Sequence, residues 1–378
     1  MSEGFAHLAL ITETYPPEVN GVAHTLRHMV EHLRARGYRV TVLRPRQAGE
    51  RAGDDLFRAL SLPFYSQVRV GYSLSGHIGQ RLRALRPDLV HIATEGPLGL
   101  AGLWAARHLK IPVVSSFHTN FDGYARHYRL QFLQGLVLCY LRCFHNATRK
   151  TLVPSWGTFA HLQAQGFLNL AMWRRGVDTA LYNPRRRSAA LRAQLGLDGD
   201  DALLIYVGRL AHEKNLAVLV NAYERLRKTW QGPGKLHLAL IGDGPLAAGL
   251  IRQRLAGFSL EGIQKGEDLA RWYASADLFC FPSCSETFGN VVLEAMASAL
   301  PVLAYDASGV NEHFRSPDEG VLLPLDGDFA SAISKLLMDR ARLREMGQRA
   351  RQRAEGQTWT HIIDTLLEEY RNSLDSVS

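Results

Sequence analysis

The 378-residue sequence lacks long apolar runs, because no stretch reaches the roughly 18 apolar residues that a membrane-spanning helix requires. Its first residues, MSEGFAHLALITETYPP, also lack the basic segment that precedes the apolar part of a signal peptide. We therefore expect the short run AHLALIT to form a first β-strand in a cytoplasmic protein.

Cysteine is scarce. The four cysteines are Cys139, Cys143, Cys280 and Cys284, which form two pairs spaced four residues apart. No histidines follow them at the spacing of a zinc site. We expect buried, reduced thiols.

Carboxylate clusters suited to a metal are also few. The stretches Asp198-Gly-Asp200 and Asp326-Gly-Asp328 lie in glycine-containing turns, where aspartate is favoured for conformational reasons. We expect neither a metal nor a cofactor.

The positive charge is confined to one half of the chain. Residues 1–170 hold 19 Lys and Arg against 10 Asp and Glu, a net +9, whereas residues 171–378 hold 25 against 26, a net −1. Such asymmetry indicates an anionic partner, either a nucleic acid or an anionic lipid surface. A basic nucleic-acid-binding protein is disfavoured because no nucleic-acid-binding motif accompanies the charge.

One basic stretch, residues 123–150, interleaves arginines with Tyr, Phe and Leu. This pattern suits an anionic membrane surface, although a helix packed on its own domain with exposed arginines would look the same. The +9 charge of the whole half favours the membrane. We therefore expect Arg126, Arg129 and Arg142 to contact the membrane or a lipid acceptor.

Apolar runs typical of strands recur along the whole chain, and helical patterns separate most of them. The runs are AHLALIT, RVTVLRP, DLVHIA, PVVSSFH, TLVPS, ALLIYVG, LHLALIG, DLFCFPS and LPVLAY. This alternation predicts an α/β protein with parallel sheets covered by helices on both faces. The series occurs twice, on either side of a polar stretch at residues 173–197, so we expect two domains with a ligand site in the cleft between them.

The segment CSETFGNVVLEAMASALP, residues 284–301, contains two carboxylates in an otherwise apolar region. A strand ending at LFCFPS and a helix starting near Gly289 or Asn290 would place Glu286 in the loop and Glu294 about one turn into the helix. Helix N-termini bind anions, so nearby carboxylates are best explained as acceptors for hydroxyl groups. A ligand that carries both phosphate and hydroxyls would fit.

The segment VGRLAHEKN follows the strand ALLIY and places Arg209 and Lys214 before a helix that starts near Leu216. Two cations at this position could clamp a diphosphate without a metal. A solvated loop would look similar, but the carboxylate loop at Glu286 favours the clamp. The glycines of IGDGPLAAGL, by contrast, are interpreted as structural.

Two residues of the first half are weaker candidates. Gly21 precedes a long amphipathic helix and would let a ligand approach the backbone. His118 ends the strand PVVSSFH, where it could contact a reacting group, although a single histidine more often has a structural role.

Taken together, these motifs resemble a known family. SETFGNVVLEAMA is similar to the E-x7-E signature of glycosyltransferase family 4, retaining enzymes with the GT-B fold of two Rossmann-like domains facing across a cleft. Within it, TETYPPEVNGVAHTL, SSFHTNFDGYARHY and WRRGVD resemble the branch of GDP-mannose-dependent mannosyltransferases and sulfoquinovosyl- and glucuronosyl-diacylglycerol synthases. The chain departs from the family at Ala299, where Gly is common, and at Arg175, where many members have Asn.

The resemblance implies a role for each candidate in the second half. Glu294 would hold the ribose hydroxyls of a nucleotide and Glu286 the hydroxyls of the donor sugar. Arg209 and Lys214 would stabilise the departing diphosphate. The backbone N–H groups from Phe288 through Gly289 to Asn290 would assist, and Ile263 would lie beside the base. In the first half, Gly21 would approach the diphosphate and His118 the sugar.

The implied reaction is metal-independent, retaining transfer of a hexose or uronic acid from a UDP- or GDP-sugar. The acceptor would be a lipid, such as diacylglycerol or a glycolipid, at the cytoplasmic face of the membrane. The alternatives are a GT-B enzyme acting on a polysaccharide, lipopolysaccharide or soluble acceptor, and a nucleotide-sugar epimerase. We place the domains at residues 1–170 and 171–355, with a helix over 356–378 that crosses back to the first domain.

Overall fold

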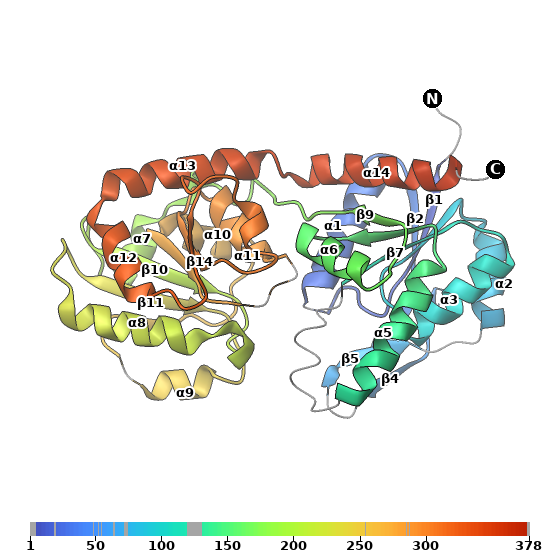
Figure 1. The fold of residues 1–378 in the computed structure, drawn as a ribbon, viewed down its shortest axis with the longest axis horizontal. Coiled ribbons are helices and arrows are strands. Elements are labelled where there is room, and N and C mark those ends of the chain that lie inside the picture. Colours follow the sequence, from blue (N-terminus) through green and yellow to red (C-terminus); the bar gives the residue numbers. More distant parts are fainter. Residues whose placement is uncertain are drawn as a thin grey trace. The chain divides into compact units, whose positions relative to one another are not determined.

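The computed structural model describes residues 5–18, 20–47, 49–51, 53, 55–62, 65–71, 75–118, 131–253, 255–284, 286 and 288–375. For residues 59–62, 65–70 and 131–134, the backbone alone is described. The chain forms two compact units (Figure 1). The first comprises Met1–Arg175 with Trp359–Ser378, and the second comprises Gly176–Thr358.

The first unit is built on a parallel sheet with the strand order β3-β2-β1-β6-β7-β8-β9. Its strands are β1 (His7–Ile11), β2 (Arg39–Pro45), β3 (Leu56–Phe57), β6 (Leu89–Ile92), β7 (Val113–Ser116), β8 (Lys150–Val153) and β9 (Leu170–Met172). A separate antiparallel hairpin pairs β4 (Ala59–Leu62) with β5 (Tyr65–Gly71). The strand order reverses between β1 and β6, so the unit is doubly wound.

Helices cover both faces of this sheet. They are α1 (Gly21–Ala35), α2 (Ser75–Leu85), α3 (Pro97–His108), α5 (Gln131–Asn146), α6 (Trp156–Ala164) and α14 (Trp359–Asp375). Strand β1 shows why two faces are needed, because Leu8 and Leu10 belong to the apolar cluster with α1 and α14, whereas Ala9 and Ile11 belong to the cluster with α2 and α3. A strand buried on both sides is therefore mostly apolar along its length.

The last helix, α14, completes the first unit. Its apolar stripe packs beside α1 (Figure 1). The Tyr370 hydroxyl is also hydrogen-bonded to Nδ1 of His91 in β6 (2.7 Å). We placed the domain changes after residues 170 and 355; the structure places them after Arg175 and Thr358, because β9 is the last strand of the first sheet and α14 begins at Trp359.

The second unit repeats the same topology. Its parallel sheet has the order β12-β11-β10-β13-β14-β15, which reverses between β10 and β13. The strands are β10 (Ala202–Val207), β11 (Leu236–Ile241), β12 (Phe258–Leu260), β13 (Leu278–Phe281), β14 (Val302–Tyr305) and β15 (Val321–Leu323). The helices are η1 (Pro184–Arg186), α7 (Ala189–Gln194), η2 (His212–Lys214), α8 (Leu216–Thr229), α9 (Ala247–Arg252), α10 (Gly266–Ser275), α11 (Asn290–Ala297), η3 (Asn311–His313), α12 (Phe329–Met338) and α13 (Arg340–Glu355).

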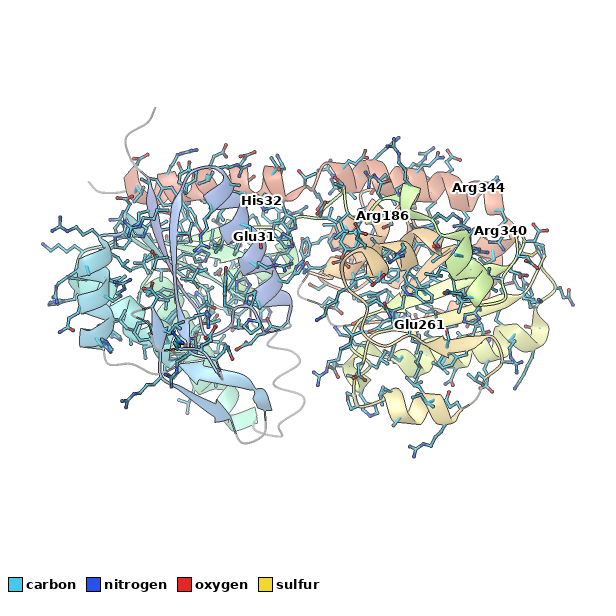
Figure 2. The ribbon with its side chains drawn as sticks, turned by 180° about the vertical axis from the view of Figure 1, so that it is seen from behind. Glu31, His32, Arg186, Glu261, Arg340 and Arg344 are labelled. Carbon is cyan, nitrogen blue, oxygen red and sulfur yellow. The ribbon has the colours of Figure 1, made fainter. Side chains whose placement is uncertain are left out.

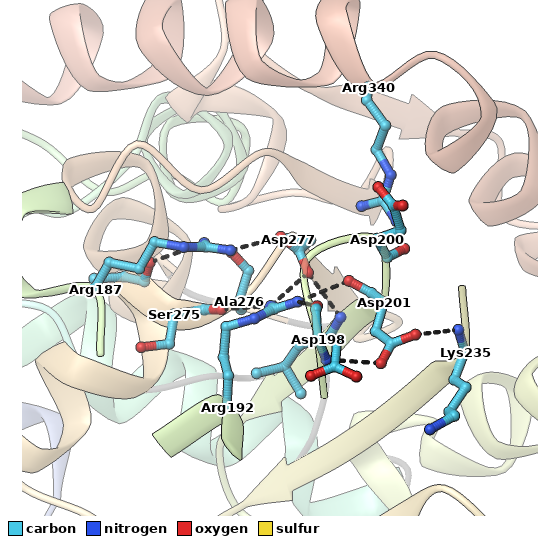
Figure 3. A network of polar contacts seen from close by, with 12 residues as sticks. Arg187, Arg192, Asp198, Asp200, Asp201, Lys235, Ser275, Ala276, Asp277 and Arg340 are labelled. Atoms are coloured by element: carbon cyan, nitrogen blue, oxygen red, sulfur yellow. Dashed lines mark hydrogen bonds and ion pairs between the residues drawn. The ribbon is translucent and has the colours of Figure 1, made fainter. Parts of the chain in front are cut away.

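A buried arginine, Arg192, links the amino-terminal ends of two strands in this second sheet (Figure 3). Arg192 of α7 donates to the carboxylate of Asp277 (2.8 Å) and to the carbonyls of Asp201 (2.7 Å) and Ser275 (3.0 Å). Asp277 also accepts the backbone N–H of Leu203 (2.8 Å). One guanidinium therefore ties α7 to the starts of β10 and β13, and it positions the strands whose far ends carry the candidate site.

The nine strands expected from the sequence are all present, so the prediction of two doubly wound parallel sheets is confirmed. The short strands β3, β9, β12 and β15 and the β4–β5 hairpin were missed. All four cysteines are free, but the expectation that they are buried is wrong for Cys139, Cys143 and Cys284, which are exposed. Among the helices in the described ranges, none combines the length and apolar character of a membrane span.

We predict that acid destabilises the first unit through His91. Burial, assisted by the charge of Arg175, lowers the pKa of His91 to about 3. The unfolded chain, in which a histidine has a pKa of about 6.5, takes up a proton that the folded state does not accept. The stabilisation is therefore complete above about pH 6.5 and is lost as the pH falls, by about 2 kcal/mol at about pH 5.

Urea unfolding at about pH 7.5 and about pH 5 measures this loss. The His91→Gln variant keeps a neutral hydrogen-bonding side chain, so its stability should fall by about 2 kcal/mol less between the two pH values than that of the wild type. An equal fall in both proteins would contradict a neutral His91.

Candidate functional site

The candidate site lies in the second unit, at the carboxyl ends of β10 and β13. The strand order reverses there, and the loops that follow the two strands leave in opposite directions. Ligands of doubly wound sheets bind at this topological switch point. The loop after β10 carries Arg209 and Lys214, and the loop after β13 carries Glu286, Phe288 and Gly289.

An ion pair joins these two loops. Nζ of Lys214 lies 2.5 Å from Oε1 of Glu286, and both side chains are mostly buried, with 20% and 13% of their surface exposed. Beside the pair, the amide of Asn215 contacts the thiol of Cys284 at 3.7 Å. The residues that the sequence assigned to the diphosphate and to the sugar are therefore direct neighbours, and each fixes the position of the other.

Arg209 occupies a more open position. Its side chain is 63% exposed, and Nη1 lies 3.6 Å from Oε1 of Glu213, which makes a weak exposed pair. Its backbone is held more firmly, because the buried hydroxyl of Tyr206 donates to the Arg209 carbonyl (3.1 Å). Arg209 is thus anchored at its backbone while its guanidinium can turn toward an anion.

The glycines of IGDGPL account for the close approach of two loops. A Cβ at Gly242 would lie 1.9 Å from the Gly208 carbonyl oxygen, and a Cβ at Gly244 would lie 2.4 Å from that of Leu210. Real atoms do not approach this closely, so larger residues would push the loop after β10 out of place. This agrees with the structural interpretation of these glycines.

The N-terminus of α11 forms the next part of the site. Gly289 has φ of 74° and provides no side chain to cap the first turn. The N–H of Val292 donates to the Gly289 carbonyl (2.9 Å), so the N–H groups ahead of it, at Asn290 and Val291, are the ones that could face a ligand. The Phe288 carbonyl hydrogen-bonds with Nε2 of the buried His313 (2.5 Å), which sets the loop. Within the described residues, Oδ1 of Asn290 and Oγ of Ser283 are buried without a hydrogen-bond partner.

Glu294 lies one turn further along α11, as predicted, and two tyrosines surround it. Tyr273 of α10 donates to Oε2 of Glu294 (3.0 Å), and the Tyr182 ring packs edge-on against that of Tyr273 at 5.7 Å. Burial raises the pKa of Glu294 to about 7, although hydrogen bonds from the two tyrosines oppose the rise. The sequence showed no signal for these tyrosines.

Ile263 belongs to the same edge of the sheet. It is 60% exposed and follows β12, two residues after Glu261, which Figure 2 labels. The N–H of Gly242 donates to the Gly262 carbonyl (2.7 Å), which ties this loop to the one after β11. An exposed apolar side chain at this position could cover a flat ring.

The other predicted residues belong to the first unit. Gly21 opens α1 after the N-cap Asn20, and nothing lies within 4 Å of the position that a Cβ would take there. Arg142 lies on α5, and its Nη1 donates to the Gln165 carbonyl (3.3 Å). Arg126 and Arg129 lie outside the described residues.

His118 follows β7 and is hydrogen-bonded through both ring nitrogens. Nε2 lies 2.9 Å from Oγ of Ser116, and Nδ1 lies 2.7 Å from Nη2 of Arg175. Burial above all, and then the charge of Arg175, lowers the pKa of His118 well below its usual value. Arg175 was noted in the sequence only as a departure from the family pattern.

Within the described residues, no group of three or more His, Cys, Asp or Glu side chains is arranged to hold a metal ion. The described polar groups of the switch point instead offer two cations, the N–H groups of a helix start and two carboxylates. This set fits a ligand that carries both negative charge and hydroxyls.

Comparison with known proteins identifies relatives of the chain. Residues 19–181 match the family model described as Glycosyltransferase Family 4, and residues 201–339 match that of Glycosyl transferases group 1. The chain is 33% identical over 376 residues to the GDP-mannose-dependent alpha-mannosyltransferase of Mycobacterium tuberculosis, with 96% of each chain covered.

Two further relatives are a sulfoquinovosyl transferase and a glucosyldiacylglycerol synthase. Sulfoquinovosyl transferase SQD2 of Arabidopsis thaliana is 32% identical, covering 93% of this chain and 71% of that protein. Alpha-monoglucosyldiacylglycerol synthase of Streptococcus pneumoniae is 26% identical, covering 88% and 78%. These matches confirm the resemblance found in the sequence.

The solved structures agree on the fold. Sucrose-phosphate synthase from Thermosynechococcus elongatus superposes with a TM-score of 0.77 at 22% identity, and the match covers 99% of this chain and 100% of that one. The GT-B fold is therefore confirmed, as two doubly wound Rossmann-like units.

We predict that Glu294 costs stability when it is ionised. Because the folded state raises the pKa of Glu294 to about 7, it binds a proton more tightly than the unfolded chain does. Stability therefore falls as the pH rises toward and through about 7. The isosteric Glu294→Gln variant should unfold at a higher temperature than the wild type at about pH 8 and at nearly the same temperature at about pH 5. A variant that is less stable than the wild type at about pH 8 would show that the ionised carboxylate is stabilising.

Proposed function

The chain belongs to glycosyltransferase family 4, and from this membership we propose that it transfers a hexose or uronic acid from a UDP- or GDP-sugar to a lipid acceptor. The ion pair between Lys214 and Glu286 carries the proposal, because it sets a cation and a hydroxyl acceptor side by side at the switch point of the second sheet. A sugar linked to a diphosphate needs these two contacts at adjacent positions.

Each part of the donor nucleotide sugar has a matching group in the site. The ribose hydroxyls donate to Glu294, whose carboxylate already accepts from Tyr273, and the base lies against the exposed Ile263. The diphosphate faces Lys214, Arg209 and the first N–H groups of α11. Glu286, next to Lys214, receives the sugar hydroxyls.

The transfer breaks the bond between the anomeric carbon and the phosphate oxygen and forms a bond from that carbon to the acceptor oxygen. The leaving phosphate takes the proton of the acceptor hydroxyl on the same face of the sugar, so the configuration is retained. Cations aimed at the leaving oxygens lower this barrier, because they act where negative charge develops. Lys214 and Arg209 provide that charge, and neither a metal nor a protein nucleophile takes part.

A lipid acceptor is supported by the outer face of α5 in the first unit. Leu136, Val137 and Tyr140 are 67%, 46% and 38% exposed, and the same helix carries Arg142. An exposed apolar face with basic neighbours suits the boundary of an anionic membrane. The +9 charge of residues 1–170 would also attract the chain to anionic lipid. We therefore place the enzyme peripherally at the cytoplasmic face of the membrane.

The alternative acceptors are a polysaccharide, a lipopolysaccharide and a soluble sugar, and a nucleotide-sugar epimerase would use the same donor site. Turnover with diacylglycerol, compared with that on soluble sugar acceptors, separates these possibilities. A salt-dependent shift with DNA, without binding to anionic liposomes, would favour the nucleic-acid-binding alternative.

We predict that the Lys214→Ala variant loses about a hundredfold in turnover, because it removes a charge-assisted contact to the leaving group. The exposed Lys228 at the end of α8 in the same unit is the matched control, and Lys228→Ala should keep wild-type turnover. EDTA should leave the wild type active. Activity that collapses in EDTA and returns with magnesium would contradict the proposed role of the two cations.

We also predict that the wild type sediments with phosphatidylglycerol liposomes at low salt. Changing Arg126, Arg129 and Arg142 to Glu should release it, because each basic residue close to an anionic surface contributes about 1 kcal/mol. Leu136→Ser should weaken sedimentation as well, through the loss of apolar contact.

The matched control reverses three exposed arginines of the second unit, Arg252, Arg342 and Arg344, which should leave sedimentation unchanged. Nucleotide affinity should be the same in both triple variants. If the wild type stays in solution with the liposomes, or if the first triple variant sediments as well as the wild type, the membrane proposal is wrong.

A further inference from the structure

Arg175 is a buried arginine of the first unit that contacts Trp173 and His118. Only 6% of its surface is exposed, and its guanidinium carbon lies 4.7 Å above the Trp173 ring. Nη1 donates to the Trp173 carbonyl (3.3 Å), and Nη2 donates to Nδ1 of His118 (2.7 Å). A guanidinium has five donors and no acceptor, so it can only donate to the ring.

This one donor fixes the direction of a chain of hydrogen bonds. If Nδ1 of His118 accepts from Arg175, the ring proton is on Nε2 and is donated to Oγ of Ser116 (2.9 Å). The Ser116 hydroxyl then donates to Nε2 of His91 (2.9 Å), and Nδ1–H of His91 donates to the Tyr370 hydroxyl (2.7 Å).

The chain ends at Met29, whose sulfur accepts from the hydroxyl of Tyr370 (3.5 Å). Every donor has one acceptor along this route. If all these hydrogen bonds were reversed, Nδ1 of His118 would carry the ring proton and would face an N–H of Arg175. The chain therefore runs one way, from Arg175 to α1.

The surroundings of His118 oppose its protonation from each side. Arg175 faces it from the segment after β9, and its charge opposes a second positive charge on the ring; the other titratable rings that face it are His91 of β6 and His145 of α5. Within the described residues, no carboxylate hydrogen-bonds to the ring; Glu95 pairs with His145 instead, at 3.1 Å. Protonation of Nδ1 would also break the contact with Arg175.

We propose that Arg175 is a positioning residue for sugar transfer, which holds His118 as a neutral ring with its proton on Nε2. The proposal rests on the function proposed above and on the role that the family resemblance implies for His118, which is to contact the donor sugar. With both nitrogens engaged inside the protein, His118 offers the sugar a rigid uncharged surface and exchanges no proton with it. The role of proton acceptor then stays with the leaving phosphate.

The test combines nuclear magnetic resonance with kinetics. In protein labelled with 15N-histidine, His118 of the wild type should show one protonated nitrogen and one unprotonated nitrogen, unchanged from about pH 8 to about pH 5. The Arg175→Met variant keeps a long apolar side chain but has no donor, so His118 should show mixed tautomers or titrate within this range. Its kcat should fall at least about tenfold with little change in the KM for the donor, since misplaced groups slow the chemical step.

The Arg175→Gln variant can still donate one N–H, so it should recover the Nε2–H tautomer and part of the kcat, and it also serves if Arg175→Met does not fold. The neighbouring Arg174→Met variant is the matched control and should leave the His118 signals unchanged. An unchanged His118 spectrum in Arg175→Met, or a protonated His118 in the wild type at about pH 7, overturns the inference. Because the spectrum needs no donor, a correct tautomer without any sugar transfer would contradict only the proposed function.

Discussion

The ion pair between Lys214 and Glu286 is the contact on which the site depends. It joins the loops after β10 and β13, and it is possible because the strand order reverses between these two strands. A mostly buried pair of this kind gains little net stability, since the loss of hydration offsets the attraction between the charges. The pair instead fixes the positions of one positive and one negative group that can face a ligand. The close contacts of Gly242 and Gly244 keep the loop after β10 in place.

The first unit relies on a polar network of a different kind. His91, Ser116 and Tyr370 are buried and hydrogen-bonded in sequence, and they connect β6, β7 and the C-terminal helix α14. Fully satisfied networks in low-dielectric surroundings are rigid, whereas partly satisfied ones are costly. The C-terminal helix α14 therefore has two roles in the first unit. It covers one face of the sheet, and its Tyr370 completes the hydrogen bonds that lead to His118.

Much of this architecture could be predicted from the sequence. Near-continuous apolar runs such as ALLIYV and LHLALI are typical of strands buried on both faces, and their alternation with helical patterns predicts two parallel sheets. The position of Glu294 followed from the glycine at the start of α11. The neighbours of these residues could not be predicted, because the contact of Tyr273 with Glu294 joins two helices through packing alone.

Other features were missed for similar reasons. The edge strands β12 and β15 have only three residues each, too few to show a period. The exposure of Cys139 and Cys143 depends on which face α5 turns outward, and its composition is apolar on both faces. Arg175 was visible only as an unusual residue, since its contact with His118 spans 57 positions of the chain.

The central claim is that the second unit binds a nucleoside-diphosphate sugar, and a thermal-unfolding panel of UDP- and GDP-sugars tests it most directly. A ligand bound only by the folded state raises its stability by mass action, by about 2.7 kcal/mol at a hundred times the dissociation constant. We expect at least one sugar nucleotide to raise the unfolding midpoint above the value seen with the bare sugar, in the presence of EDTA. If no member of the panel changes the midpoint at millimolar concentration, the account of the site is contradicted.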